Sequence, residues 1–290
     1  MNKAKIIAEI GAVHLGSLER AKELASLSRI CGADYVKTQK RNPEESTPNH
    51  MRDLPHPNKI FSYGDTYLEH RQNLELDIQE HIELKKYCDS IGIKYSSSVW
   101  DITSAREIIN LNPDFIKVPS ACNQHWKMLN IIKDEYDGQI HISSGMTTRE
   151  ETEKLVEWMK PIGERIVYYH CTSKYPCPFE NLYLLEIEKM KPLTKYGITL
   201  GFSNHGKGIA SDMAAYVLGA EWIERHFIDD RTIRHTDAAA SLEPSGLKKL
   251  CRDLNAVYRA MDIKPKKMDE EEIEQRKKLK FSGDDYGNGS

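Results

Sequence analysis

Short apolar runs alternate with longer amphipathic segments along most of this chain. The apolar runs are rich in Ile, Val, Tyr and Phe, which favour extended backbone. Each run is too short for a helix of usual length and is bounded by polar or turn-forming residues. The runs predict eight strands, at residues 5–12, 35–39, 94–99, 115–120, 139–145, 165–171, 198–204 and 222–228.

The segments between the runs have apolar residues at helical spacing. The clearest predicted helices cover residues 18–33, 148–160, 208–220 and 243–261. Thr148 is followed three residues later by Glu151, which is a capping-box signature at a helix start. Gly219 is typical of a helix C-terminus, because glycine adopts the left-handed conformation found there.

This alternation predicts parallel strands joined by crossover helices. Eight strand–helix units over about 260 residues match the usual size of a (β/α)8 TIM barrel, and we predict an α/β chain with that fold. A doubly wound open sheet is the alternative. It is less favoured because no GxGxxG motif follows any predicted strand.

Two regions interrupt the alternation. Residues 40–76 form a long connection rich in Pro, Asn and charged residues, after the second predicted strand. In a barrel this connection lies on the face where active sites are built. Residues 263–290 have few large apolar residues and end in Gly, Asp, Asn and Ser, so we predict a barrel domain over 1–262 and a charged, flexible tail over 263–290.

The composition restricts the classes of binding partner and the cellular compartment expected for this protein. The net charge of −3 gives no sign of nucleic-acid or anionic-membrane binding. No apolar run approaches the roughly 18 residues needed to span a membrane, and the N-terminus lacks the features of a signal peptide. The six cysteines are scattered through a long chain, which favours reduced thiols and a cytoplasmic location.

Two histidines end consecutive predicted strands. His205 stands in GFSNHGKG and His226 in WIERHF. Each could be a satisfied core histidine, but the C-terminal ends of strands seven, eight and one are neighbours in a closed barrel. His205, His226 and Glu9 could therefore meet around one ion. Two imidazoles and a carboxylate suit a divalent transition metal such as Mn²⁺ or Zn²⁺ and leave positions open for substrate.

Two lysines lie inside predicted strands. Lys37 or Lys117 alone would be interpreted as a side chain that extends from the barrel exterior to solvent. Together, near serines at strand ends, they suggest a doubly charged anion, most simply a phosphate. A metal-dependent barrel hydrolase would account for the histidines but not for these lysines. Cys171 and Met146 are expected to be packing residues.

At these residues the chain resembles the sialic acid (N-acetylneuraminate) synthases and their relatives. The resemblance runs from about residue 5 to about 262 in blocks that include IIAEIGAVHLGSLERAKELA, FIKVPS, HCTSKYPCPFENLYL, GFSNHGKGIAS and DAAASLEP. It implies a TIM barrel that condenses phosphoenolpyruvate with an aldehyde sugar, an aldose or an N-acyl hexosamine such as N-acetylmannosamine. It also implies assistance by a divalent metal, often Mn²⁺, with Mg²⁺ or Co²⁺ as alternatives.

The resemblance also assigns residues. It implies that His205 and His226 hold the metal and that Glu9 lies beside metal and sugar. The phosphoenolpyruvate contacts that it implies are Lys37, Ser98, Lys117, Ser120, Ser143, Ser173 and Ser203. The sugar contacts that it implies are Gln39, Tyr175 and Asp237. The lysines would hold the phosphate through the charge changes of the reaction.

The chain departs from the family pattern at several points. Cys122 aligns with an acidic residue, and Asn204 stands where the family has Asp before the metal-binding histidine. Family members typically carry a C-terminal antifreeze-like domain of roughly 60 residues, which supplies an arginine to the sugar across a homodimer. We expect that this domain has been lost or comes from a separate partner protein. Arg41, Arg52 or Arg71 is then the candidate replacement cation.

These departures leave two classes of function open. The first is an active phosphoenolpyruvate-dependent synthase of the sialic acid type, or a related nonulosonic acid synthase, that releases phosphate. The alternative is a catalytically impaired barrel that binds sugar or phosphoenolpyruvate, or that serves as a partner subunit. A relaxed preference for N-acetylmannosamine is expected in the first case, since the arginine that reads the N-acyl group is missing from this sequence.

Overall fold

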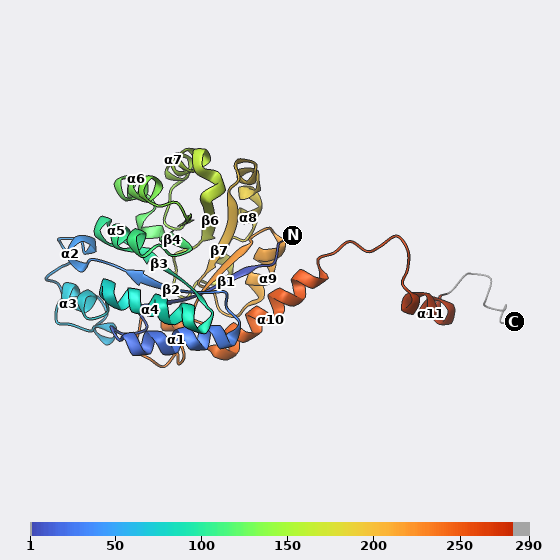
Figure 1. Ribbon diagram of the computed structural model, residues 1–290, viewed down its shortest axis with the longest axis horizontal. Helices are drawn as coiled ribbons and strands as arrows, with labels where there is room; N and C mark the ends of the chain where they lie inside the picture. Colours follow the sequence, from blue (N-terminus) through green and yellow to red (C-terminus); the bar gives the residue numbers. More distant parts are fainter. Residues whose placement is uncertain (1, 281–290) are drawn as a thin grey trace. The chain divides into compact units, whose positions relative to one another are not determined.

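Eight parallel strands close into one barrel in the order β1 to β8, which confirms the (β/α)8 prediction (Figure 1). The computed structural model describes residues 2–280. The strands are β1 (Lys5–Gly11), β2 (Tyr35–Lys40), β3 (Lys94–Val99), β4 (Phe115–Val118), β5 (Gln139–Ser143), β6 (Ile166–Cys171), β7 (Thr199–Asn204) and β8 (Trp222–His226). Strand β8 pairs with β1 and completes the barrel.

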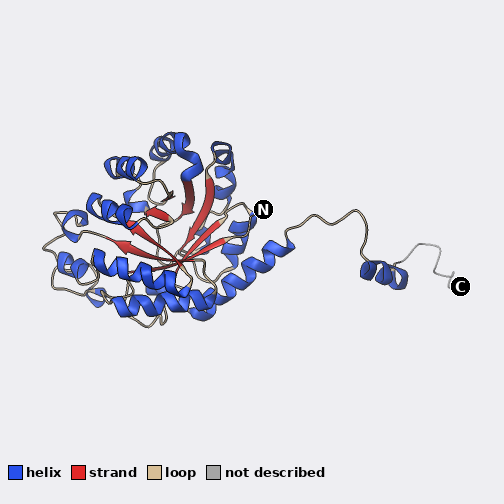
Figure 2. Cartoon of the chain, in the orientation of Figure 1, coloured by secondary structure: helices blue, strands red, loops and turns tan. Residues whose placement is uncertain are grey.

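Helices surround the strands and connect each one to the next (Figure 2). They are α1 (Leu18–Cys31), α2 (Pro43–Ser46), α3 (Tyr67–Gln72), α4 (Ile78–Ile91), α5 (Ile102–Leu111), α6 (Trp126–Glu135), α7 (Arg149–Met159), α8 (Leu185–Met190), α9 (Ala210–Val217) and α10 (Pro244–Ala260). A further helix, α11 (Glu270–Leu279), belongs to the second unit of the chain. Short 3-10 turns extend several of the connections.

The helix ends follow local capping chemistry. The Thr148 hydroxyl accepts the backbone N–H of Glu151 at 3.2 Å, and the Glu151 carboxylate accepts the N–H of Thr148 at 2.8 Å, which confirms the capping box. Helix α9 is shorter than predicted. Its C-cap is Leu218, which is still right-handed, and Gly219 follows with φ 115°. The glycine therefore turns the chain one residue beyond the cap.

Four strands, β1, β4, β5 and β8, end earlier than predicted, and β4 and β8 show the physical reason. Strand β4 stops at Val118, since Pro119 has no N–H for the ladder and the next residues form a 3-10 turn. Strand β8 stops at His226, and Phe227 makes only an isolated bridge to Leu242. Both changes shorten the barrel at its C-terminal end. The side chains that follow these strands are therefore carried by loops.

Aromatic and aliphatic side chains fill the inside of the barrel near its N-terminal end. This cluster is made of Ile7, Tyr35, Phe115, Val167, Tyr169 and Trp222. The ring of His141 stacks on Phe115 with centroids 3.8 Å apart. A separate and larger apolar core lies between the strands and the helices. These side chains close the barrel at its N-terminal end, and the free space inside the barrel lies toward the C-terminal ends of the strands.

The long connection between β2 and β3 covers part of that end. It contains α2, a 3-10 turn at Lys59–Phe61 and α3. The Tyr63 hydroxyl donates to the carbonyl of Arg234, on the connection after β8. His56, His70 and Arg71 from the β2–β3 connection line the cavity described below. The expectation that residues 40–76 lie on the active-site face is therefore met.

Two compact units make up the chain, residues 1–258 and residues 259–290. In the second unit, helix α11 begins at the cap residue Asp269, and Lys264 pairs with Glu272. The last part of the predicted flexible tail, 281–290, lies outside the described residues.

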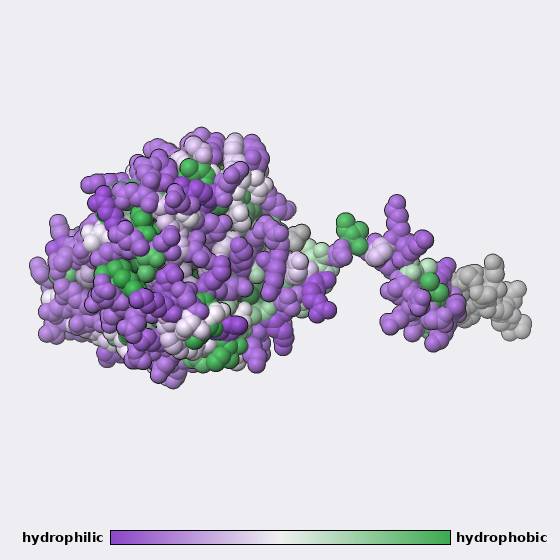
Figure 3. Space-filling view, in the orientation of Figure 1, coloured by the Kyte–Doolittle hydropathy of each residue, from purple (hydrophilic) through white to green (hydrophobic). Residues whose placement is uncertain are grey.

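The face of the chain in Figure 3 is mostly hydrophilic with small apolar groups. Within residues 2–280, no helix has the length and apolarity to cross a membrane.

Candidate active site

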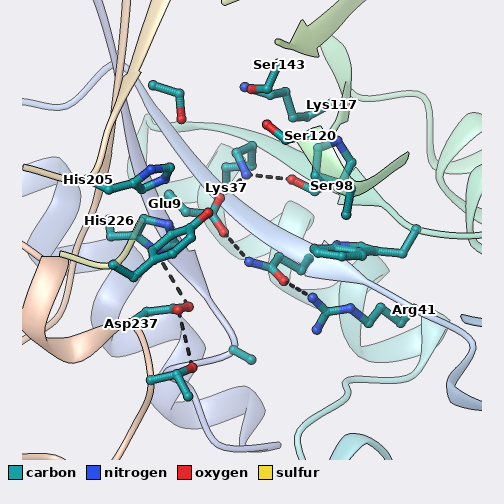
Figure 4. Close-up of a pocket in the computed structure, with 18 of the residues that line it drawn as sticks. Glu9, Lys37, Arg41, Ser98, Lys117, Ser120, Ser143, His205, His226 and Asp237 are labelled. Atoms are coloured by element: carbon teal, nitrogen blue, oxygen red, sulfur yellow. Dashed lines mark hydrogen bonds and ion pairs between the residues drawn. The ribbon is translucent and has the colours of Figure 1, made fainter. Parts of the chain in front are cut away.

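A cavity of about 270 Å³ opens at the C-terminal ends of the strands. It contains every site residue predicted from the sequence except Ser173. Those that line it are Glu9, Lys37, Gln39, Ser98, Lys117, Ser120, Ser143, Tyr175, Ser203, His205, His226 and Asp237 (Figure 4). They come from all eight strands or from the loops that follow them. Barrel closure is what brings them together.

Two buried lysines and two buried carboxylates form the inner part of the site. Lys37 forms an ion pair with Glu9 and lies 3.9 Å from Glu224. Lys117 lies 3.1 Å from Glu224 and sits 3.6 Å from the centre of the Tyr169 ring. All four charged side chains are at most 8% exposed. The cluster is therefore balanced in charge and largely removed from water.

Burial and neighbouring charges perturb this cluster. Burial raises the pKa of Glu9 to about 7, although Lys37 opposes the shift. Burial acts the same way on Glu224, but Lys117 and Lys37 together outweigh it and hold its pKa below the usual range. Burial also lowers the pKa of Lys117. One carboxylate is thus held ionised between the lysines, while the other can hold a proton near neutral pH.

Glu224 was not predicted from the sequence. It precedes His226 by two residues on the same strand. Because alternate residues of a strand point to the same face, this spacing places it on the side of the sheet that carries the predicted metal ligand. That parity was the available signal.

Serine hydroxyls surround the lysines. Ser98 accepts a hydrogen bond from Lys37 Nζ at 2.6 Å, and Ser203 donates to Glu224 Oε1 at 3.0 Å. Ser173 does not line the cavity but lies next to it. A side chain at Gly145 would come within 2.4 Å of the Ser173 hydroxyl and 2.6 Å of the Ser120 hydroxyl. The glycine thus keeps a small polar space open between them.

The two histidines lie side by side at the cavity, with ring centroids 5.3 Å apart (Figure 4). Nδ1 of His205 lies 2.9 Å from the carbonyl oxygen of Thr172, so Nδ1 carries the proton and Nε2 is left for a ligand. Nδ1 of His226 lies 3.7 Å from Asp237 Oδ2. Burial lowers the pKa of His226 to about 4, so this imidazole is neutral at neutral pH.

These histidines fit a metal site with two protein ligands. The Thr172 carbonyl oxygen is hydrogen-bonded to Nδ1 of His205, an arrangement common behind metal-bound imidazoles, and Asp237 lies near Nδ1 of His226 without a hydrogen bond. Burial opposes the charged form of His205, but contacts with Cys171 and Thr172 outweigh it and raise its pKa. Within residues 2–280, no three His, Cys, Asp or Glu side chains are grouped to hold an ion, so Glu9 does not complete a three-ligand set.

The outer wall of the cavity carries further polar groups. Gln39 donates to Glu9 Oε1 at 3.0 Å and accepts from Arg41 Nη2 at 2.7 Å. The ring of Tyr175 lies 4.1 Å from that of His205. Asp237 lies between His226 and His235, at 3.7 and 3.8 Å. A chain of polar contacts therefore joins the inner lysines to the outer wall.

Two residues expected to be packing residues, Cys171 and Met146, line this cavity. Cys171 is buried at the end of β6, with Sγ 4.0 Å from His205 Nδ1 and 3.7 Å from the Ser120 hydroxyl. Met146 is 67% exposed and has φ 56°. Cys171 is therefore a buried residue that also borders the cavity, whereas Met146 is not part of the core.

The departures from the family pattern lie outside the cavity lining. Asn204 points away from the site and donates to Ser211 at 2.9 Å and to Asp212 at 2.8 Å. Cys122 is buried, donates to the carbonyl of Trp100 at 3.5 Å, and burial raises its pKa to about 12. Neither substitution therefore changes the charge of the side chains that line the cavity.

Comparison with known proteins agrees with this geometry. Residues 24–266 match the model of the NeuB family. The chain is 34% identical to the N-acetylneuraminate-9-phosphate synthase of Homo sapiens, over 91% of this chain and 72% of the relative. It is 32% identical to the N,N'-diacetyllegionaminic acid synthase of Campylobacter jejuni, over 90% and 78% of the two chains.

Solved structures give the same result. The N-acetylneuraminic acid synthetase of Leptospira borgpetersenii superposes with a TM-score of 0.79 at 25% identity, over 96% of this chain and 93% of that one. A truncated 3-deoxy-D-arabino-heptulosonate 7-phosphate synthase from Thermotoga maritima, at 15% identity and a TM-score of 0.64, shares the fold. With its barrel, its lysine and histidine pairs and these relatives, all synthases, the chain belongs to the NeuB family.

Proposed function

We propose that this protein condenses phosphoenolpyruvate with an aldehyde sugar to give a nonulosonic acid and inorganic phosphate. The observation that carries the proposal is the inner cluster, in which Lys37 and Lys117 lie buried beside serine hydroxyls and across from two histidines. Buried ammonium groups with hydroxyl donors around them suit a phosphate ester. The histidines suit the oxygen of an aldehyde that must gain negative charge.

Ligand binding would exchange partners within this cluster. In the ligand-free chain the lysines are neutralised by Glu9 and Glu224. Phosphoenolpyruvate brings a phosphate and a carboxylate, which can take over the lysine contacts. Ser98, already bonded to Lys37, would then turn its hydroxyl toward the ligand. Protonation of Glu9 near neutral pH would release Lys37 for the incoming anion.

The reaction balances with one water molecule. C3 of phosphoenolpyruvate attacks the aldehyde carbon, and the aldehyde oxygen takes up a proton. Water adds at C2 and loses a proton, and phosphate then leaves with its bridging oxygen by cleavage of the C2–O bond, while the C2 hydroxyl gives its remaining proton to phosphate and becomes the ketone. Glu9, which can hold a proton and lies next to Lys37, is the proposed proton donor to the new hydroxyl group.

His205 and His226 would hold a divalent metal, with Mn²⁺ as the first candidate and Mg²⁺ or Co²⁺ as alternatives. When bound, the metal would supply Lewis-acid polarisation of the aldehyde oxygen. Gln39, Tyr175 and Asp237 line the outer half of the cavity and would orient the sugar hydroxyls.

The names of relatives support this class of product and differ in the sugar. One is named for N-acetylneuraminate 9-phosphate and others for diacetyllegionaminic and pseudaminic acids. An aldose or an N-acyl hexosamine is therefore the proposed acceptor class. A homodimer, or a separate antifreeze-like partner, stays a prediction.

The test is phosphate release from phosphoenolpyruvate, measured with Mn²⁺ across a panel of aldoses and N-acyl hexosamines. We expect release only with an acceptor, and one new carbon–carbon bond per phosphate. Lys117→Met should abolish it. Lys40→Met is the matched control, since Lys40 is also buried but pairs with Glu107 outside this cavity. Release without an acceptor, or full turnover by Lys117→Met, would contradict the proposal.

A further inference from the structure

Tyr169 and His141 lie inside the barrel, one step toward its N-terminal end from the cavity. His141 is on β5, two residues before the cavity residue Ser143. Tyr169 is on β6, two residues before Cys171, which also borders the cavity. Because alternate residues of a strand share a face, both side chains point into the barrel. Both are 0% exposed, so they belong to the floor on which the anion site stands.

The position of Lys117 depends on the ring of Tyr169. The ammonium makes one hydrogen bond to the described residues, to Glu224 Oε2 at 3.1 Å. Lys37 is held more fully, by its ion pair with Glu9 and by the Ser98 hydroxyl at 2.6 Å. What Lys117 has in addition is the face of the Tyr169 ring, 3.6 Å from Nζ. Burial lowers the pKa of Lys117, and a ring face that attracts cations opposes this loss of charge.

The ring of Tyr169 is itself held by His141. The Tyr169 oxygen lies 2.9 Å from Nδ1 of His141. Burial raises the pKa of Tyr169 well above its usual range, so the hydroxyl keeps its proton. Burial likewise lowers the pKa of His141 well below its usual range, so the imidazole is neutral. Nδ1 is the only hydrogen-bond partner of this hydroxyl among residues 2–280, so the hydroxyl donates and Nδ1 accepts.

The other nitrogen of His141 has no such role. With Nδ1 as acceptor, Nε2 carries the hydrogen, and it has no partner in the described part of the chain. The imidazole stacks on Phe115 with centroids 3.8 Å apart and meets Trp222 edge-on at 4.5 Å. A buried N–H without a partner is unfavourable, and an aliphatic side chain would avoid that cost. The contact that accounts for a polar side chain at this position is the hydrogen bond to Tyr169.

We propose that Tyr169 is a positioning residue of the phosphoenolpyruvate site, whose ring holds the Lys117 ammonium toward the cavity and is itself held by His141. Ligand binding would replace part of the contact between Lys117 and Glu224. The ring contact would remain, and the ammonium would stay in place. Without the ring, the flexible lysine stem would have to be ordered by the ligand, which costs affinity. This inference rests on the proposed function, because it takes Lys117 as a phosphoenolpyruvate contact.

The experiment measures phosphoenolpyruvate affinity by calorimetry on the full chain. Tyr169→Leu removes the ring face, and we expect affinity to fall about tenfold, as the loss of a desolvated cation–π contact would give. Tyr169→Phe keeps the ring face and should stay close to wild type. Tyr169→Met fills more of the space and replaces Tyr169→Leu if that variant does not fold.

Tyr168→Leu is the matched control. Tyr168 is the preceding residue of β6 and is 1% exposed, but it belongs to the apolar core between strands and helices. Its replacement should lower stability and leave phosphoenolpyruvate affinity unchanged. A general effect of a lost tyrosine ring on the barrel would instead lower affinity in both variants.

A cycle of urea unfolding tests the contact between Lys117 and Tyr169 without any ligand. It compares wild type, Tyr169→Leu, Lys117→Met and the double variant. Residues in contact are not additive, so Tyr169→Leu should destabilise the Lys117→Met protein clearly less than it destabilises wild type. Equal destabilisation in the two backgrounds would show that the ring does not hold this ammonium.

The role of His141 is tested by rescue. His141→Leu leaves the Tyr169 hydroxyl buried without its acceptor, and should lower both stability and phosphoenolpyruvate affinity. Adding Tyr169→Phe removes that hydroxyl and should restore most of both, because no unpartnered group is then left. Failure of this rescue would overturn the assignment of His141.

The outcomes separate this proposal from the function on which it rests. Wild-type phosphoenolpyruvate affinity in Tyr169→Leu, the same loss in Tyr168→Leu, or an additive unfolding cycle would overturn the proposal. If wild-type protein bound no phosphoenolpyruvate, the proposed function would fail. The unfolding cycle would then still decide whether Tyr169 holds Lys117.

Discussion

Glu224 should be the most important single charge for the stability of the ligand-free site. Its carboxylate accepts from Lys117 at 3.1 Å, lies 3.9 Å from Lys37 and accepts from the Ser203 hydroxyl at 3.0 Å. Glu224→Gln keeps the shape and an oxygen acceptor for Ser203 but removes the charge. Lys37 retains Glu9, so the loss falls mainly on Lys117.

The magnitude follows from burial. Glu224 and Lys117 are 8% and 2% exposed, so water screens their attraction very little. Removing one partner of a buried ion pair costs about 3–5 kcal/mol. Lys117 would keep the face of Tyr169 at 3.6 Å, a contact worth up to about 2 kcal/mol when desolvated. We therefore expect the free energy of unfolding to fall by about 3 kcal/mol, the low end of that range.

Urea unfolding of the ligand-free protein would measure this loss. Adding Lys117→Met to Glu224→Gln should recover most of it, since the uncompensated ammonium is then gone. Inorganic phosphate should stabilise Glu224→Gln more than wild type, because it can replace the missing charge and binds only the folded state. Glu150→Gln, in an exposed pair with Lys154, is the control and should change nothing measurable. Wild-type stability in Glu224→Gln would refute the argument.

Three further predictions follow from the same contacts. A His205→Ala/His226→Ala double variant should lose Mn²⁺ binding in calorimetry with an unchanged circular dichroism spectrum; retained affinity would rule out these ligands. Burial raises the pKa of Glu75 to about 7, so its proton stabilises the folded state fully below pH 4.5, and this stability is lost as pH rises through 7. Relative to Glu75→Gln, wild type should lose on the order of 3 kcal/mol across that window in urea titrations, and parallel curves would count against the shift. Asn204→Asp should lower the unfolding free energy by about 1–3 kcal/mol, because its amide donates to Asp212 at 2.8 Å; a neutral result would contradict the assigned hydrogen bond.

Most of the fold could be predicted because pattern and local chemistry agree. The strand at 94–99 has the predicted bounds, and the capping box at Thr148 sets the start of α7 as expected. Errors lie at element ends. Residues 119 and 120 have strand-like neighbours, yet Pro119 cannot join the ladder. Such ends depend on which backbone groups find partners, and apolar periodicity does not report that.

The site could be predicted where strand parity and motif agree. Lys37 and Gln39 share one face of β2, and both line the cavity. The sequence offered Arg41 as one of three candidate replacement cations. It could not single out Arg41, because the stacking of its guanidinium on the Trp100 ring is a tertiary contact. Loop residues are placed by tertiary contacts between segments far apart in the chain. Those contacts separate Arg41 from Arg52, which faces Glu44 instead.

The positions of Asn204 and Cys122 bear on the alternative of a catalytically impaired barrel. Asn204 Oδ1 accepts the N–H of Gly206 at 2.7 Å, while its amide meets Asp212, which pairs with Arg225 at 2.7 Å. An aspartate there would place two carboxylates beside one guanidinium, so the amide suits this network. The Asn204 side chain positions the loop after β7 through the hydrogen bond to Gly206, on the helix-facing side of the strand. Cys122 lies under Trp100 and leaves the lysine, carboxylate and histidine charges of the cavity unaltered. The two substitutions that motivated an inactive barrel therefore give it no support, and turnover with a suitable acceptor is the measurement that decides between the two functions.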